Sequence, residues 1–117
     1  MKFLFILNDP PYGTERAYNA LRLAINVLVK TEGAEVSVFL LGDGASASKS
    51  GQQTPNGYYN IERMLTSVLN KGGAVKVCGT CMDARGITES ELVAGAHRST
   101  MDELTELTSS TDKVLVF

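Results

Sequence analysis

Short apolar runs alternate along this chain with longer segments in which apolar residues recur every three or four positions. The short runs have the length and the β-branched or aromatic content of strands, and they cover residues 2–7, 36–41, 75–77 and 113–117. We expect a further brief strand at residues 96–99. Strands that alternate with helical segments are typical of βαβ units. The pattern predicts an α/β fold, a three-layer sandwich in which a five-stranded, mainly parallel sheet carries helices on both faces.

Two segments show helical spacing over their whole length. Residues 15–30 and residues 61–69 both place apolar side chains in alternating steps of three and one. Gly33 follows the first segment and Gly72 the second, and glycine is a common helix stop signal. We therefore expect an amphipathic helix at each of these two places.

Two threonines later in the chain carry the pattern of a helix start. Thr88 with Glu91, and Thr100 with Glu103, fit the capping box, in which a hydroxyl and a carboxylate satisfy exposed amides. We expect helices to begin near both threonines. The second of them should face the core with Met101, Leu104 and Leu107, and the apolar run 114–117 should be a central strand.

Polar or reactive residues follow three of the predicted strands: Asn8 and Asp9, then Asp43, then Cys78. The carboxyl ends of parallel strands meet at one edge of a sheet, where sites of α/β proteins form, so these residues should converge. Residues 46–57 are rich in Ser, Gln, Gly and Asn, a composition that we expect to be too polar to pack. They predict a mobile surface loop that is able to cover this edge.

Composition limits the partners and the compartment. The 117 residues fit one domain, which we expect to span residues 1–117. A net charge of −2 gives no basic stripe, so nucleic acid and anionic membranes are disfavoured as partners. The N-terminal apolar run is too short for a signal peptide, and no run approaches the ~20 residues of a membrane span. We expect a cytoplasmic protein whose thiols are kept reduced.

Both cysteines of the chain, Cys78 and Cys81, lie where the third predicted strand ends. Free backbone amides at such a turn lower a thiol pKa, and the thiolate is the nucleophile. Cys81 should lie close enough to form a disulfide with Cys78 or to accept a sulfur atom. Arg85 would add positive charge nearby, whereas Asp9 and Asp43 would raise the thiol pKa if they are close.

Other interpretations of the cysteines remain open. Both can be inert core thiols, since free cysteine is often buried. A structural zinc site needs four ligands, but the chain offers two cysteines and the single His97. A thioredoxin-type enzyme usually has a later cis-proline, and no proline follows Pro55. The turn at residues 8–13 has two prolines and Asp9, which disfavours phosphate binding, so we expect no metal and no cofactor.

A few further side chains are candidates for the site. His97 is the one imidazole available as a general base, and Arg22 is a candidate for an interface or an anionic ligand, although a solvated charge explains it as well. Tyr58 and Tyr59 either cover the cysteines or fill a subunit contact, and we favour the subunit contact. The residues expected around Cys78 and Cys81 are Asn8, Asp9, Tyr12, Asp43, Tyr58 and Arg85.

The chain resembles the DsrE/DsrF-like family of intracellular sulfur-relay proteins, and within it the small YchN-like branch. The cysteine motif and its place in the chain are the most specific part of the resemblance. The matching positions are Asn8, 11–13, Glu15, 20–24, 38–43, 57–58, 60–61, 77–86, 112–115 and Phe117.

The resemblance implies a flavodoxin-like sandwich that assembles as a trimer or hexamer. It also implies a cysteine after the third strand that carries persulfide sulfur, at the position of Cys78, between a donor such as a cysteine desulfurase and an acceptor thiol. Relatives commonly use one cysteine at this site. A second one, Cys81, would be able to discharge a persulfide on Cys78, releasing sulfide and leaving a disulfide.

Two classes of function therefore remain. The first is a sulfur-handling protein that acts through Cys78, with Cys81 as resolving thiol. The second is a non-catalytic oligomeric module that binds a small ligand or a protein and in which the cysteines merely pack. The first class predicts a thiol that alkylates quickly near neutral pH and loses this reactivity in Cys78→Ser.

Overall fold

The computed structural model describes the whole chain, residues 1–117, and its backbone confirms the predicted α/β sandwich. Five strands form one sheet in the order β4-β3-β2-β1-β5, and every pairing between neighbours is parallel. The strands are β1 (Lys2–Leu7), β2 (Glu35–Leu40), β3 (Ala74–Cys78), β4 (Ala96–Ser99) and β5 (Lys113–Val116).

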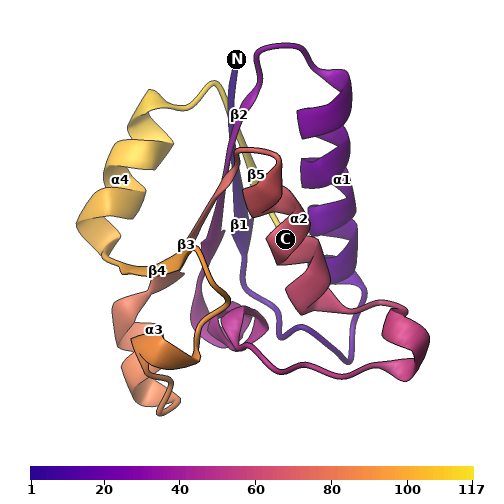
Figure 1. Ribbon diagram of the computed structural model, residues 1–117. Helices are drawn as coiled ribbons and strands as arrows, with labels where there is room; N and C mark the ends of the chain where they lie inside the picture. The colour runs from indigo at the N-terminus through magenta and orange to yellow at the C-terminus, as the bar shows by residue number, and fades with distance from the viewer.

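Helices cover both faces of the sheet (Figure 1). The helices α1 (Arg16–Lys30) and α2 (Ile61–Asn70) pack side by side on one face, and α4 (Met101–Ser110) crosses the other. Asn60 caps α2 by accepting from the amide of Arg63, and Thr100 caps α4 by accepting from the amide of Glu103. The short helix α3 (Gly79–Ala84) lies at the carboxyl edge of the sheet, at the bottom of Figure 1.

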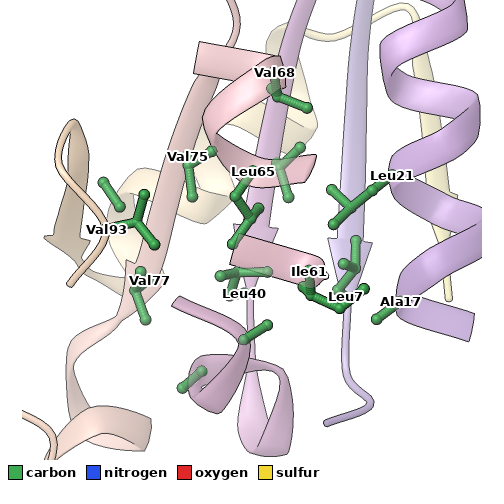
Figure 2. Close-up of a cluster of buried hydrophobic side chains, with 14 of the residues drawn as sticks. Leu7, Ala17, Leu21, Leu40, Ile61, Leu65, Val68, Val75, Val77 and Val93 are labelled. Atoms are coloured by element: carbon green, nitrogen blue, oxygen red, sulfur yellow. The ribbon is translucent and has the colours of Figure 1, made fainter. Parts of the chain in front are cut away.

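The main core lies between the sheet and the α1–α2 face. Figure 2 shows how side chains from the strands and both helices meet there; they include Leu7, Ala17, Leu21, Leu40, Ile61, Leu65, Val68, Val75 and Val77. The opposite face holds a smaller cluster of Leu4, Phe39, Cys78 and Leu104. Successive residues of a strand point to opposite faces, so Val77 belongs to the main core and its neighbour Cys78 to the smaller one.

The prediction of a mobile surface loop at residues 46–57 is wrong for residues 46–48. Residues Gly42–Ser48 form a 3-10 helix, η1, in which Ala45, Ala47 and Ser48 are fully buried. The Ser48 hydroxyl donates to the carbonyl of Ala45 at 2.6 Å, and its own carbonyl accepts from the amide of Val93 at 2.7 Å. Because its polar groups are satisfied and its alanines are small, this segment packs instead of covering the edge from outside.

The helix expected at Thr88 is also wrong. The capping box forms, but it begins only the three-residue 3-10 helix η3 (Glu89–Glu91), after which Leu92 and Val93 turn into the core. The third α-helix is instead α3, which starts directly after Cys78. A cap satisfies the first amides of a helix but supplies none of the apolar packing that extends it.

Two predictions near the end of the chain are wrong: that residues 114–117 form a central strand and that Met101 faces the core. The strand β5 is an edge strand, and the side chain of Val116 is 64% exposed. At the start of α4, Met101 is 58% exposed, whereas Leu104 is buried as predicted. The helices contain no segment that is both long enough and apolar enough to cross a membrane.

Candidate functional site

Cys78 is the last residue of β3 and comes directly before α3. The residue is only 4% exposed and packs against Leu4, Phe39 and Leu104 on the α4 side of the sheet. The hydroxyl oxygen of Thr80 lies 3.3 Å from its sulfur. The end of a buried strand thus presents this sulfur to polar groups of the following turn.

Cys81 lies one turn further, on α3, and is half-buried. Its sulfur accepts a hydrogen bond from the backbone amide of Gly42 at 3.2 Å. This bond joins α3 to η1, the segment that follows β2. Both cysteines are free thiols.

The two thiols have opposite pKa shifts. Burial raises the pKa of Cys78, but hydrogen bonds from the side chains and backbone amides of Cys81 and Thr80 outweigh it, so the pKa is lower than usual. Burial and the hydrogen bond to Cys78 raise the pKa of Cys81, against the smaller opposing effects of the Gly42 amide and Arg85. Cys78 is therefore the more acidic thiol of the pair, and Cys81 is the less acidic one.

Arg85 and Asp43 lie beside the cysteines and pair with each other. The guanidinium donates to one Asp43 oxygen from Nε at 3.0 Å and from Nη2 at 2.7 Å, and its Nη1 donates to the carbonyl of Cys81 at 3.1 Å. The two residues tie the end of α3 to η1. The charge of Asp43, which would raise the thiol pKa, is thus offset by a neighbouring cation.

Two other predicted residues lie at the same edge of the sheet but toward β5. The side-chain amide of Asn8 donates from Nδ2 to the carbonyl of Phe117 at 3.3 Å. Asp9 accepts from the Thr14 hydroxyl at 2.9 Å and faces Arg16 at 3.9 Å. A hollow of about 400 Å³ is lined by Asn8, Asp9, Arg16, Val116 and Phe117. Their hydrogen bonds run to this hollow and not to the cysteines.

The two tyrosines of the predicted set lie near α1 and α2. The hydroxyl of Tyr12 donates to Gln52 at 2.6 Å and accepts from the backbone amide of Ile61 at 3.2 Å. Tyr58 is 67% exposed and packs edge-on against Tyr59, with ring centroids 4.5 Å apart. Within one chain, the structure therefore brings Asp43 and Arg85 to the cysteines, but neither tyrosine forms a hydrogen bond with them.

One charged pair at this edge was missed by the sequence reasoning. Arg98, on β4, donates two hydrogen bonds to the carboxylate of Asp83 on α3, at 2.8 and 2.9 Å. An arginine near the carboxyl end of a strand was a signal that could have drawn attention to it. His97, its neighbour, is exposed, and no group of three His, Cys, Asp or Glu side chains is arranged to hold a metal ion.

Comparisons with known proteins agree with this architecture. The uncharacterized protein MJ0989 of Methanocaldococcus jannaschii is 42% identical over 117 residues, all of both chains. Protein YchN of Escherichia coli is 39% identical over 116 residues, 99% of this chain and 98% of its own. The crystal structure of the E. coli ychN protein superposes with a TM-score of 0.94, at 38% identity, covering 100% of this chain and 99% of that one. A family model matches residues 1–117, and the chain belongs to the DsrE/DsrF-like family.

Proposed function

We propose that this protein handles sulfur, taking up a sulfane sulfur atom as a persulfide on Cys78, with Cys81 as the resolving thiol. The observation that carries the proposal is the pair of free thiols where β3 meets α3, in which the pKa of Cys78 is lowered and that of Cys81 is raised. A thiolate next to a thiol donor is the arrangement that sulfur exchange requires. Membership of the DsrE/DsrF-like family supports a sulfur-relay role.

The loading step is an exchange between sulfur atoms. The thiolate of Cys78 attacks the outer sulfur of a donor persulfide, so that a new S–S bond forms as the donor's own S–S bond breaks. The donor leaves as a thiolate, and Cys78 carries the persulfide. In the forward transfer, the thiolate of an acceptor attacks that outer sulfur, and Cys78 returns to its thiolate form.

Cys81 offers a second outcome. After losing its proton, its sulfur attacks Cys78 Sγ, the bond to the outer sulfur breaks, and hydrosulfide leaves. The product is a Cys78–Cys81 disulfide, which two electrons from an external dithiol restore to the two thiols. Since the pKa of Cys81 is raised, its thiolate is scarce near neutral pH, and an acceptor thiol has time to take the sulfur first.

We further propose that the protein is cytoplasmic and assembles as a trimer or hexamer. A reducing compartment suits two free thiols. Exposed apolar side chains of α1 and of the segment before α2 support self-association. Leu23 and Val29 border a hollow of about 610 Å³, and Tyr59, which packs against Tyr58, borders a second hollow that shares Ile25 and Met64 with the first. Light scattering of the purified protein tests the assembly, and a monomer at micromolar concentration would refute it.

Intact mass spectrometry tests the sulfur chemistry. Reduced protein is incubated with polysulfide, or with a cysteine desulfurase and cysteine, alongside Cys78→Ser and Cys81→Ser. We expect an adduct of ~32 Da, one sulfur atom, that dithiothreitol removes, that is absent in Cys78→Ser and that persists in Cys81→Ser. No adduct in any form would overturn the proposal and favour a binding module with packed cysteines.

A further inference from the structure

The guanidinium of Arg98 lies against the backbone of Gly79, the residue after Cys78. A Cβ atom placed on Gly79 would lie 2.8 Å from both Cζ and Nε of Arg98 and 3.0 Å from Nη2. Gly79 has no positive φ, so conformational freedom does not explain glycine at this position. The missing side chain leaves the space that Arg98 fills.

Two elements hold Arg98 in this place. Its backbone is on β4, in register with Val77, the residue before Cys78. Its guanidinium donates in parallel to both oxygens of Asp83, two residues beyond Cys81. Both side chains are largely exposed, and exposed ion pairs add little to stability. A contribution to folding stability therefore does not explain why Arg98 and Asp83 form two parallel hydrogen bonds at this place.

The charge of Arg98 acts on the sulfur site. The hydrogen bonds and charge of Asp83 are the main reason that the pKa of Arg98 is raised, and the Cys78 thiolate contributes in the same direction. The interaction is reciprocal, so the guanidinium also favours negative charge at Cys78, but by less than the hydrogen bonds from Cys81 and Thr80 do. Arg85, by comparison, acts on Cys81.

We propose that Arg98 is a positioning residue that holds a cation beside Cys78 and makes this thiol selective for small anionic sulfur donors. The inference rests on the proposed function and specifies its substrate class as sulfane-sulfur anions such as polysulfide. We expect the sulfur donor to be small because Cys78 is only 4% exposed. We expect it to be an anion because the guanidinium of Arg98 lies over Gly79. A fixed cation concentrates anions at a partly closed site and stabilises the charge that passes through it.

Tetrasulfide serves as the probe for this step. The Cys78 thiolate attacks a terminal sulfur of the tetrasulfide dianion, a bond forms between these two sulfurs, and the neighbouring S–S bond breaks. The products are the Cys78 persulfide anion and a trisulfide dianion, so charge and sulfur balance with no further reactant. Two anions meet in this reaction, and a nearby guanidinium lowers their repulsion.

The selectivity is measured as the ratio of the alkylation rates with iodoacetate and with iodoacetamide. Both reagents alkylate a thiolate with loss of iodide, but only the first is an anion, so the ratio reports local charge independently of thiol pKa. All measurements use the Cys81→Ser background, which leaves Cys78 as the reacting cysteine. In Arg98→Gln we expect the ratio to fall about two- to fivefold, and the rate with tetrasulfide to fall with it.

Two variants control for other effects. Gly79→Ala retains every charge but displaces the guanidinium, so its ratio should fall in the same direction as that of Arg98→Gln. Arg16→Gln removes a cation that also lies at this edge of the sheet, but next to Asp9, and should leave the ratio unchanged. Circular dichroism establishes that each variant is folded. In the background protein, added salt should reduce the ratio, because ions screen the charge.

The outcomes separate this inference from the proposed function. An unchanged ratio in folded Arg98→Gln, or an equal slowing with both reagents, overturns the role of Arg98, whatever tetrasulfide does. A ratio that falls in a protein that takes no sulfur from tetrasulfide supports the cation at Cys78 and overturns the proposed sulfur chemistry. A fall in the ratio with a matching fall in sulfur uptake supports both.

Discussion

Gly44 of η1 lies so close to β1 that any side chain there would collide with the backbone. A Cβ atom at this position would lie 2.2 Å from the carbonyl oxygen of Leu7 and 2.9 Å from its carbon. The same segment supplies the amide of Gly42 to Cys81 and the carboxylate of Asp43 to Arg85. Gly44→Ala therefore tests the packing that joins the core to the candidate site.

The size of the effect follows from the geometry. A relaxed carbon–oxygen contact is about 3.3 Å, so the alanine has to move the backbone by about 1 Å. Neither atom it meets belongs to a flexible side chain, and the neighbouring Ala45 and Ala47 of η1 are fully buried. We expect a loss of about 3 kcal/mol in the free energy of unfolding, a large part of the stability of a small domain.

Urea unfolding measures this loss as a lower midpoint with an unchanged slope. Gly51→Ala is the matched control, because it lies in the same connection with nothing within 4 Å of its Cβ. Its φ of +88° still disfavours alanine, and we expect a cost of about 1 kcal/mol there. If Gly44→Ala costs no more than Gly51→Ala, the close approach of η1 to β1 does not exist as described.

Three further predictions concern the thiols and the charged pairs. Cys81→Ala removes a hydrogen-bond donor, so the pKa of Cys78 should rise and its alkylation near pH 7 should slow roughly tenfold; an unchanged pH–rate profile would contradict the thiol pairing. Arg85→Gln removes a cation that lowers the pKa of Cys81, so peptide mass spectrometry should find slower alkylation at Cys81 alone. The free energy of unfolding of Arg85→Gln should differ from that of the unchanged protein by less than about 1 kcal/mol, because the ion pair between Arg85 and Asp43 is exposed to solvent. Hydrogen bonds from Ser99 and then Lys76 lower the pKa of Glu103, so the stability they add is complete above the usual value of 4.5 and is lost as pH falls through the lowered value. Between pH 7 and about pH 3, Glu103→Gln should therefore lose less of its urea midpoint than the unchanged protein does.

The secondary structure was largely predictable because its pattern is local. The amphipathic period of residues 15–30 recurs in α1, and the short run 96–99 is β4 residue for residue. The position of β5 was not predictable in this way. Its residues read as a buried strand, but whether a strand lies at the centre or the edge depends on the path of the whole chain.

The site was predictable only where it follows from the ends of strands. The topological rule placed Asp43 and Cys78 at one edge, and the spacing placed Cys81 beside Cys78. The partner of Arg98 required the register of β3 against β4, which leaves no signal in one sequence. The packing of η1 was hidden in the same way, because its serines and glycines look like a solvated loop until their tertiary partners are known.

Under the proposed function, Cys81 links the redox state of the site to the packing beneath it. Its side chain packs against both the main core and the smaller cluster that contains Cys78, and its sulfur accepts from the amide of Gly42. To attack Cys78, this sulfur has to exchange the Gly42 amide for a covalent bond, and η1 then loses one of its links to α3. The same contact that holds Cys81 in place therefore opposes disulfide formation, and under the proposed function it favours passing sulfur to an acceptor over releasing it as hydrosulfide.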